Sequence, residues 1–127
     1  NLNIESYGQK EFEATYELLC IWFDELFSLC EPEDIGNYHE TMLASFAVIF
    51  AIAHYAMQGL EDESYKNRDL LVKRRMQNLK GIDWTRNQEI WKQFEGDFKG
   101  KEQYYYVNQN KRTVSSIVEW LTREGGE

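Results

Sequence analysis

The sequence is poor in residues that interrupt helices and in motifs that mark catalytic centres. Its 127 residues include a single proline, Pro32, and few glycines fall inside the apolar runs. Scarce helix breakers favour helices over a β-sandwich. The chain contains no glycine-rich phosphate loop, no H-E-x-x-H motif and no C-x-x-C pair. We therefore expect an all-α protein that is not an enzyme, with no catalytic residue, no metal site and no cofactor.

Histidine is also scarce, because His39 and His54 are the only two. They would lie about 22 Å apart on one unbroken helix, too far to share a metal ion. His54 lies in an apolar run and is expected to be a hydrogen-bonded residue of the core or its boundary, whereas His39 is expected to be exposed. The acidic sequence 61–63 lacks calcium-loop spacing and suits the start of a helix.

Cysteine is limited to Cys20 and Cys30. On one helix the two lie about 15 Å apart along the axis, which is too far for a disulfide. A pair of reduced thiols is typical of a cytoplasmic protein, which is the localisation we expect. Free cysteines are usually buried, and we expect both to pack as small hydrophobic residues.

Long hydrophobic runs are absent apart from residues 42–57, where only Ser45 and His54 are appreciably polar. A membrane span needs roughly 18 apolar residues, and acids flank this run closely. We therefore expect no membrane partner. A helix over 38–57, ended by Gly59, is predicted to be the central helix of the core.

The first predicted helix covers residues 9–30 and is followed by a loop in the sequence CEPEDIGNY. Its apolar residues recur at alternating steps of four and three, which predicts a stripe facing the core. This stripe comprises Phe12, Tyr16, Leu19, Phe23, Leu26 and Cys30. Further apolar residues widen it, namely Leu18, Ile21, Trp22, Phe27 and Leu29. We expect this helix to be buried on more than one side.

The charges of the chain are divided unevenly. Residues 1–65 hold one base and 13 acids, a net charge of 1 − 13 = −12, whereas residues 66–127 hold 13 bases and nine acids, a net charge of 13 − 9 = +4. A third helix is predicted over residues 62–79, with Tyr65, Val72, Met76 and Leu79 facing inward. Six bases lie between positions 66 and 80. This clustering indicates a polyanion-binding face. The alternatives are a basic half that neutralises acidic surface elsewhere in the full protein and an ordinary solvated face.

Residues 81–91 read GIDWTRNQEIW. Gly81 is expected to cap the third helix, and Thr85 or Asn87 to cap a short helix that carries Ile90, Trp91 and Phe94. The apolar residues of this stretch predict a structural joint against the core. An extended segment is expected near residues 101–108, and a closing helix from Thr113 with Val114, Ile117, Val118 and Leu121 inward. We thus expect one domain over residues 1–127, a compact bundle of about five helices around the central one.

The same stretch resembles the C-terminal region of the DndB family, bacterial proteins of DNA phosphorothioation systems, and of related DGQHR-domain proteins. That family has a segment of the type L-x-x-I-D-W-[ST]-[RK]-x-N-x-x-W. The matching residues are Leu79, Ile82, Asp83, Trp84, Thr85, Arg86 and Trp91. Asn87 falls one place before the family's usual asparagine, and the D-G-Q-H-R signature is absent. The similarity covers about residues 38–124 and identifies no catalytic residue.

The resemblance implies a DNA-associated protein, since the family includes transcriptional regulators of their own modification operon. It also implies that the chain is the C-terminal part of a longer protein, whose N-terminal domain would be a partner. Together with the basic cluster it predicts DNA contacts from Arg68, Lys73, Arg74, Arg75, Arg86 and Asn87. The second hypothesis is a non-enzymatic domain that binds another protein or forms a homo-oligomer. A hydrolase centred on His39 or His54 is the third.

Overall fold

The computed structural model describes residues 2–30 and 37–125, with side chains from Gly8 onward. The chain is mainly helical, which confirms the predicted class. Its described elements are α1 (Leu2–Ser28), η1 (Tyr38–Glu40), η2 (Met42–Ala44), α3 (Phe46–Ala56), η3 (Leu60–Asp62), α4 (Tyr65–Gln77), η4 (Glu89–Gln93), β1 (Gly96–Lys99), β2 (Tyr104–Val107) and α5 (Lys111–Gly125). The loop predicted after the first helix lies largely outside the described residues.

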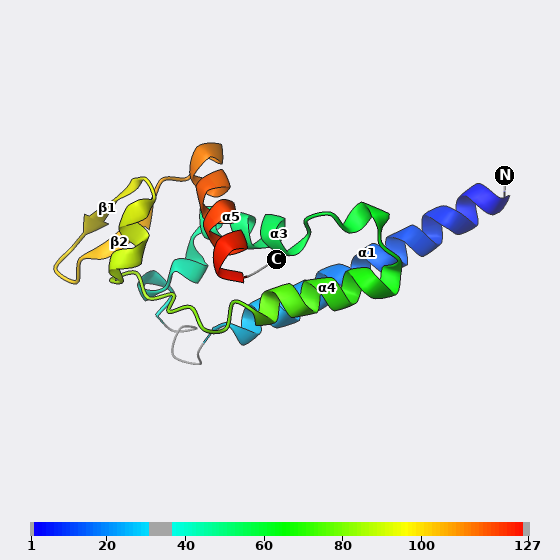
Figure 1. Ribbon diagram of the computed structural model, residues 1–127, viewed down its shortest axis with the longest axis horizontal. Helices are drawn as coiled ribbons and strands as arrows, with labels where there is room; N and C mark the ends of the chain where they lie inside the picture. The colour runs from blue at the N-terminus through cyan, green and yellow to red at the C-terminus, as the bar shows by residue number, and fades with distance from the viewer. Residues whose placement is uncertain (1, 31–36, 126–127) are drawn as a thin grey trace.

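The elements are arranged in an elongated molecule rather than a compact bundle (Figure 1). Helices α1 and α4 lie side by side and run in the same direction, and the N-terminal turns of α1 extend beyond α4. Helices α3 and α5 pack against each other next to the β-hairpin. As a result, α4 is the main neighbour that α1 has along its length.

The contact between α1 and α4 is built from one face of each helix. Trp22 and Leu26 of α1 are buried together with Leu29, which directly follows the helix. Val72 and Met76 of α4 are also buried, together with Leu79 just after that helix. These positions recur every three or four residues, as expected of a helix–helix seam. At the far end of the seam the Arg68 guanidinium lies 3.5 Å from the Glu11 carboxylate. Three of the four predicted inward residues of the third helix are therefore buried, and Tyr65 is exposed.

The predicted helix over 38–57 is wrong in its first half, because α3 begins only at Phe46. Thr41 has an extended backbone and pairs with Thr85 in an isolated β-bridge. The Met42 N–H donates to the Trp84 carbonyl (2.7 Å), and the Arg86 N–H donates to the Glu40 carbonyl (2.8 Å). These bonds to a distant segment use backbone groups that a continuous helix would need. Residues 38–44 instead form two short 3-10 turns.

Local capping rules hold at the end of α3 and at the start of α4, but not at the end of α4. Gly59 has a left-handed backbone (φ 65°) and follows α3, as predicted. The Ser64 side chain caps α4 by accepting from the Asn67 N–H (3.3 Å). Gly81 does not cap α4, because the helix ends at Gln77 with Asn78 at its C-cap and Gly81 does not have the left-handed backbone of Gly59. The correction follows from backbone bonds that continue as turns through residues 78–82.

The predicted extended segment near residues 101–108 is the second strand of a β-hairpin. Strand β2 pairs antiparallel with β1, with Gly96 opposite Val107 and Lys99 opposite Tyr104. The first strand was not expected from the sequence. Position 96 of this strand requires a glycine, because the Cβ of any other residue would lie 2.3 Å from the Tyr106 carbonyl oxygen. Gly100 supplies a left-handed turn residue (φ 77°).

The predicted joint in GIDWTRNQEIW is confirmed by an aromatic cluster. Trp84 and Trp91 are buried, and their rings stack with centroids 5.9 Å apart. Trp120 of α5 meets both indoles edge-on, at 6.5 Å and 5.5 Å. The Trp91 indole N–H donates to the Thr85 carbonyl (2.7 Å). The expected short helix is the 3-10 turn η4, which follows Gln88 rather than a cap at Thr85 or Asn87, and its Ile90 is exposed.

Candidate interaction surfaces

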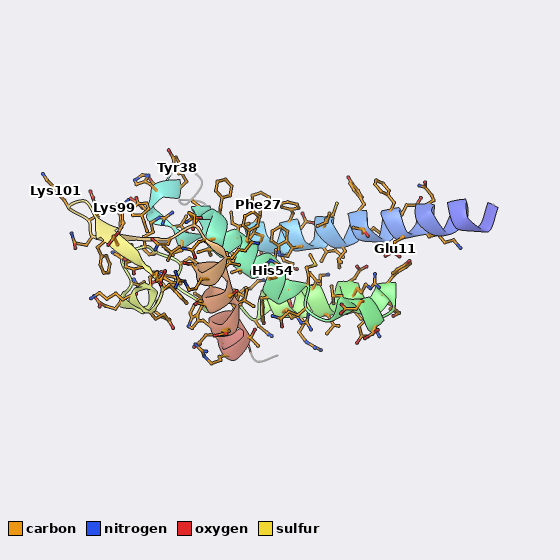
Figure 2. All side chains as sticks on the ribbon, turned by 90° about the horizontal axis from the view of Figure 1, so that it is seen from above. Glu11, Phe27, Tyr38, His54, Lys99 and Lys101 are labelled. Carbon is orange, nitrogen blue, oxygen red and sulfur yellow. The ribbon has the colours of Figure 1, made fainter. Side chains whose placement is uncertain are left out.

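The most unusual surface of the molecule is a stripe of large apolar side chains along α1. Five large apolar residues of this helix have side chains that are exposed to solvent. They are Phe12 (67%), Tyr16 (63%), Leu19 (43%), Phe23 (48%) and Phe27 (68%). Figure 2 shows Phe27 on the side of α1 that points away from α4. We call these five residues the α1 stripe.

The α1 stripe corrects the predicted orientation of the first helix. Four of the six residues expected to face the core, Phe12, Tyr16, Leu19 and Phe23, face solvent instead. Leu26 is buried and Cys30 is partly buried, as expected. The physical reason is that a single helix, α4, covers only one side of α1. The sequence predicted correctly that α1 is apolar over more than one side, but the second side has no cover among the described residues.

The geometry of the α1 stripe is regular. At 3.6 residues per turn its members fall within a sector about 80° wide and cover about 22 Å of helix axis. Along one border lie Glu13, Glu17 and Asp24, all of which are exposed. Cys20 lies between the stripe and this acidic border and is exposed, so its predicted burial is wrong. The surface is a narrow apolar band with a negatively charged edge.

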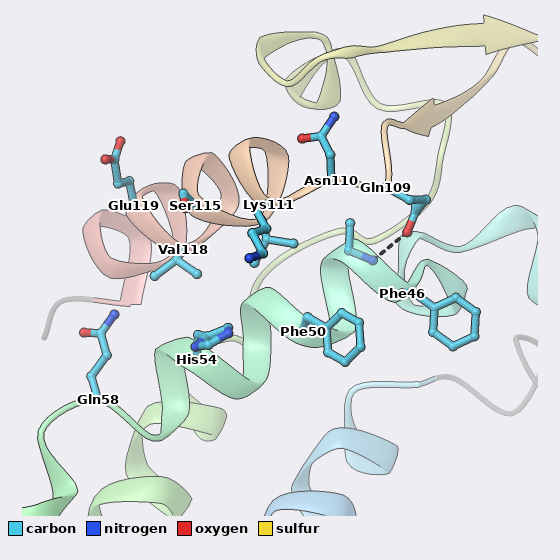
Figure 3. A pocket seen from close by; sticks show the side chains of 12 residues that line it. Phe46, Phe50, His54, Gln58, Gln109, Asn110, Lys111, Ser115, Val118 and Glu119 are labelled. Atoms are coloured by element: carbon cyan, nitrogen blue, oxygen red, sulfur yellow. Dashed lines mark hydrogen bonds between the residues drawn. The ribbon is translucent and has the colours of Figure 1, made fainter.

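A second apolar surface is a groove of about 980 Å³ between α3 and α5 (Figure 3). Phe46 and Phe50 line it and are 72% and 58% exposed, so α3 is not covered on all sides as a central helix would be. One end is closed by Gln109, whose side-chain oxygen accepts from the Ala47 N–H (2.8 Å) and whose amide donates to the Ser45 hydroxyl (3.0 Å). His54 also lines the groove and is exposed, rather than packed in the core or at its boundary.

Three of the predicted DNA contacts are arginines whose donors serve the fold. The Arg68 Nε donates to the carbonyls of Leu60 (2.8 Å) and Glu63 (3.1 Å). The Arg75 Nη1 donates to the carbonyls of Ala56 (3.1 Å) and Gln58 (2.6 Å). Both residues therefore hydrogen-bond the segment around Gly59 to α4. These guanidinium groups satisfy carbonyls that the end of α3 and the following turn leave open.

Arg86 is buried and links the hairpin to the preceding segment. Its Nη1 donates to the Tyr105 carbonyl (3.1 Å), and its guanidinium lies over the Tyr106 ring, 4.4 Å from the centroid. Burial lowers the pKa of Arg86 from its ordinary value, and the neighbouring Tyr106 opposes this shift. An arginine keeps its charge at neutral pH even after such a shift. The group is thus a buried cation held by a carbonyl and an aromatic face.

The remaining predicted DNA contacts, Lys73, Arg74 and Asn87, are exposed. Lys73 shares the outward face of α4 with Lys66, seven residues earlier, and Lys80 is exposed in the turn after the helix. Asn87 lies in the segment beside the hairpin, and its side-chain oxygen accepts from the Gln88 amide (3.2 Å). The structure therefore separates the six predicted residues between α4 and the hairpin end of the molecule and does not place them on one face.

The described residues hold no cluster of metal-ligating side chains. His39 is exposed as predicted and lies 3.9 Å from the Glu40 carboxylate. Within 2–30 and 37–125, no helix has the length and apolar character that crossing a membrane requires. No disulfide joins Cys20 to Cys30.

Comparison with known proteins does not assign the chain to a family. No protein-family model, no curated protein and no solved structure matches it. The resemblance of residues 79–91 to the DndB family stays a prediction. What the chain does must therefore be inferred from its surfaces.

Sequence reasoning missed the two surfaces that the fold leaves uncovered. The sequence of α1 did contain a signal for its uncovered surface, because its apolar residues occupy a wider angle around the helix axis than one neighbouring helix can cover. The groove had no comparable signal, because a helix such as α3 shows the same apolar composition whether all or part of it is buried.

Proposed function

We propose that this chain is a non-enzymatic protein-interaction domain that binds through the α1 stripe. The observation that carries this proposal is the exposure of five large apolar side chains on one helix face, at 43% to 68%. Monomeric proteins rarely leave a contiguous apolar patch of several hundred square ångströms in water, and such patches mark sites of association. The groove beside Phe46 and Phe50 adds a second apolar surface of the same kind.

Two further features support an interaction domain over an enzyme. The buried charged group Arg86 is bonded to the Tyr105 carbonyl within the fold, and the described residues hold no cluster of metal-ligating side chains. The thiols of Cys20 and Cys30 suit a reducing compartment, so we place the protein in the cytoplasm. Its partner would be another part of the same protein, a second copy or a different protein. The α1 stripe is apolar, so the partner's contact surface would be apolar too.

Site-specific photocrosslinking in the native host tests this proposal. Phe23 is replaced by a benzoyl-phenylalanine, which keeps the aromatic ring, and Leu70 receives the same replacement as a control. Leu70 is 56% exposed on the outward face of α4 and matches Phe23 in exposure. We expect protein adducts from position 23 well above those from position 70. Equal yields at the two positions would contradict an interaction surface on α1.

A second candidate function is DNA association, favoured by the outward face of α4. Lys66 and Lys73 are exposed on this face and Lys80 is exposed just after the helix, with the partly buried Asp69 between the first two. The resemblance to DndB-like proteins points to the same function, a C-terminal domain that contributes to DNA binding or assembly. Phosphate contacts release counterions, so such binding must weaken steeply as salt rises. Absence of binding to duplex DNA, or binding that ignores salt, would reject this candidate.

A further inference from the structure

We infer that the partner of the α1 stripe is a second copy of this chain, packed antiparallel so that the two α1 helices meet about a twofold axis between Leu19 and Cys20. This inference rests on the proposed interaction function and adds the identity of the partner. It follows from the spacing of the aromatic residues in the stripe and from the area of the stripe, and Cys20 allows it to be tested.

The four aromatic residues of the stripe, Phe12, Tyr16, Phe23 and Phe27, have the same spacing read in either direction, with steps of four, seven and four residues. An antiparallel twofold axis midway between Leu19 and Cys20 places Phe12 opposite Phe27 and Tyr16 opposite Phe23. Each aromatic ring of one helix therefore meets an aromatic ring of the other. A twofold interface must be self-complementary in this sense, because the same patch is used on both subunits. A stripe that served an unrelated helix would need no such symmetry.

The exposed area is sufficient for a dimer. A whole aromatic side chain presents on the order of 200 Å². The exposed fractions of the five side chains then amount to roughly 600 Å² of apolar surface per chain. Complete burial of the stripe in two copies would remove about 1,200 Å² from water, which reaches the lower bound of stable specific interfaces. We therefore expect a reversible dimer that forms at micromolar concentrations rather than an obligate one.

The acidic border gives this dimer a characteristic salt dependence. When the twofold axis is perpendicular to the helices, each flank of α1 meets the same flank of its copy. Glu13, Glu17 and Asp24 of one chain then approach the same residues of the other. Salt screens repulsion between exposed charges. Raising the salt concentration should therefore strengthen the dimer, whereas it weakens binding to DNA.

Cys20 allows the arrangement to be tested directly in the full chain. It is exposed and lies within one residue of the twofold axis. In a Cys30→Ser background, a short bismaleimide should join Cys20 to Cys20 of the second copy. The yield should rise with protein concentration up to about 100 μM and with salt. Leu19→Glu combined with Phe23→Glu should lower the yield by about tenfold or more, because both charges would be buried against apolar groups.

Orientation is read from a mixing experiment in chains that carry Cys20→Ser and Cys30→Ser. One chain carries Phe12→Cys and the other Phe27→Cys, and Leu70→Cys serves as the control on α4. The antiparallel dimer predicts a mixed product of the first two and no product from the control. A dominant product between two Phe12→Cys chains would overturn the antiparallel arrangement.

Self-association would be overturned if no cross-link between two Cys20 residues formed at about 100 μM while a monofunctional maleimide still labelled Cys20. Circular dichroism checks that each variant keeps its helices. If that result is accompanied by adducts of another protein from position 23 in cells, the proposed interaction function stands and only the second copy is rejected. If both experiments are negative, both proposals fail.

Discussion

Trp22 and Phe23 are consecutive residues of α1 whose rings touch edge-on, with centroids 4.8 Å apart, yet they face different surroundings. The Trp22 side chain is 5% exposed and belongs to the seam with α4, whereas Phe23 is 48% exposed and belongs to the α1 stripe. The boundary between core and interaction surface therefore runs between two neighbouring positions. This relationship allows stability and association to be separated by mutation.

Replacing either residue by alanine should have different effects on folding. Trp22→Ala leaves a cavity in the seam and should lower the free energy of unfolding by about 3–5 kcal/mol. Phe23→Ala should lower it by only about 0.5–1.5 kcal/mol in dilute solution, where the chain is monomeric, because it removes the edge-on contact with Trp22. Urea unfolding at low protein concentration measures both. Equal losses would mean that Phe23 is part of the core.

Arg86→Lys should destabilise the fold by about 1–3 kcal/mol. A lysine cannot reproduce the contact of the planar guanidinium with the Tyr106 ring together with the bond to the Tyr105 carbonyl. The matched control is Lys80→Gln, which removes an exposed charge. Thermal unfolding of the two variants compares them. A neutral effect of Arg86→Lys on stability would return Arg86 to the list of candidate ligand contacts.

Gly96→Ala should destabilise the hairpin by about 1–3 kcal/mol, because strand β2 must move to admit the new methyl group. The nearest atom is the Tyr106 carbonyl oxygen, 2.3 Å from the position of that methyl. Gly81→Ala is the control, since no atom outside its own neighbours lies within 4 Å of its Cβ position. Hydrogen exchange of the β2 amides reports the effect locally. Similar exchange in the two variants would contradict the close approach.

DNA association should depend on the exposed Lys73 and Lys80 and not on Arg68. Lys73→Gln and Lys80→Gln should each reduce the slope of log affinity against log salt by about one. Arg68→Gln should alter stability instead, because its guanidinium is bonded to the Leu60 and Glu63 carbonyls. Fluorescence anisotropy with a labelled duplex measures the slopes. A larger loss of slope from Arg68→Gln would reverse this assignment.

The local patterns of the sequence predict much of the fold. Helical spacing locates α1, α4 and α5, and Gly59 marks the end of α3. Residues 38–44 were predicted as helix because their composition is helical, but their backbone bonds to residues 84–86 override that preference. Such non-local bonds cannot be read from a pattern of apolar residues. The same holds for β1, which becomes a strand by pairing with β2.

The candidate site could be predicted only in part. The apolar residues of α1 are evident in the sequence, but whether Phe23 faces α4 or water depends on how many helices surround α1. The basic cluster of 66–80 shows the converse error. Arg68 and Arg75 look like surface charges in the sequence, yet their donors are bonded to carbonyls around Gly59. In both cases the sequence gives the type of residue but not the groups that contact it in the folded chain.

The molar mass of the chain as a function of concentration and salt tests the central claim most directly. Sedimentation equilibrium should show a rise from 15.2 kDa toward twice that value as the protein is concentrated. High salt should shift this rise to lower concentrations, and Leu19→Glu combined with Phe23→Glu should abolish it while Leu70→Glu does not. A mass that stays at 15.2 kDa at every concentration and salt would contradict the pairing of two α1 helices.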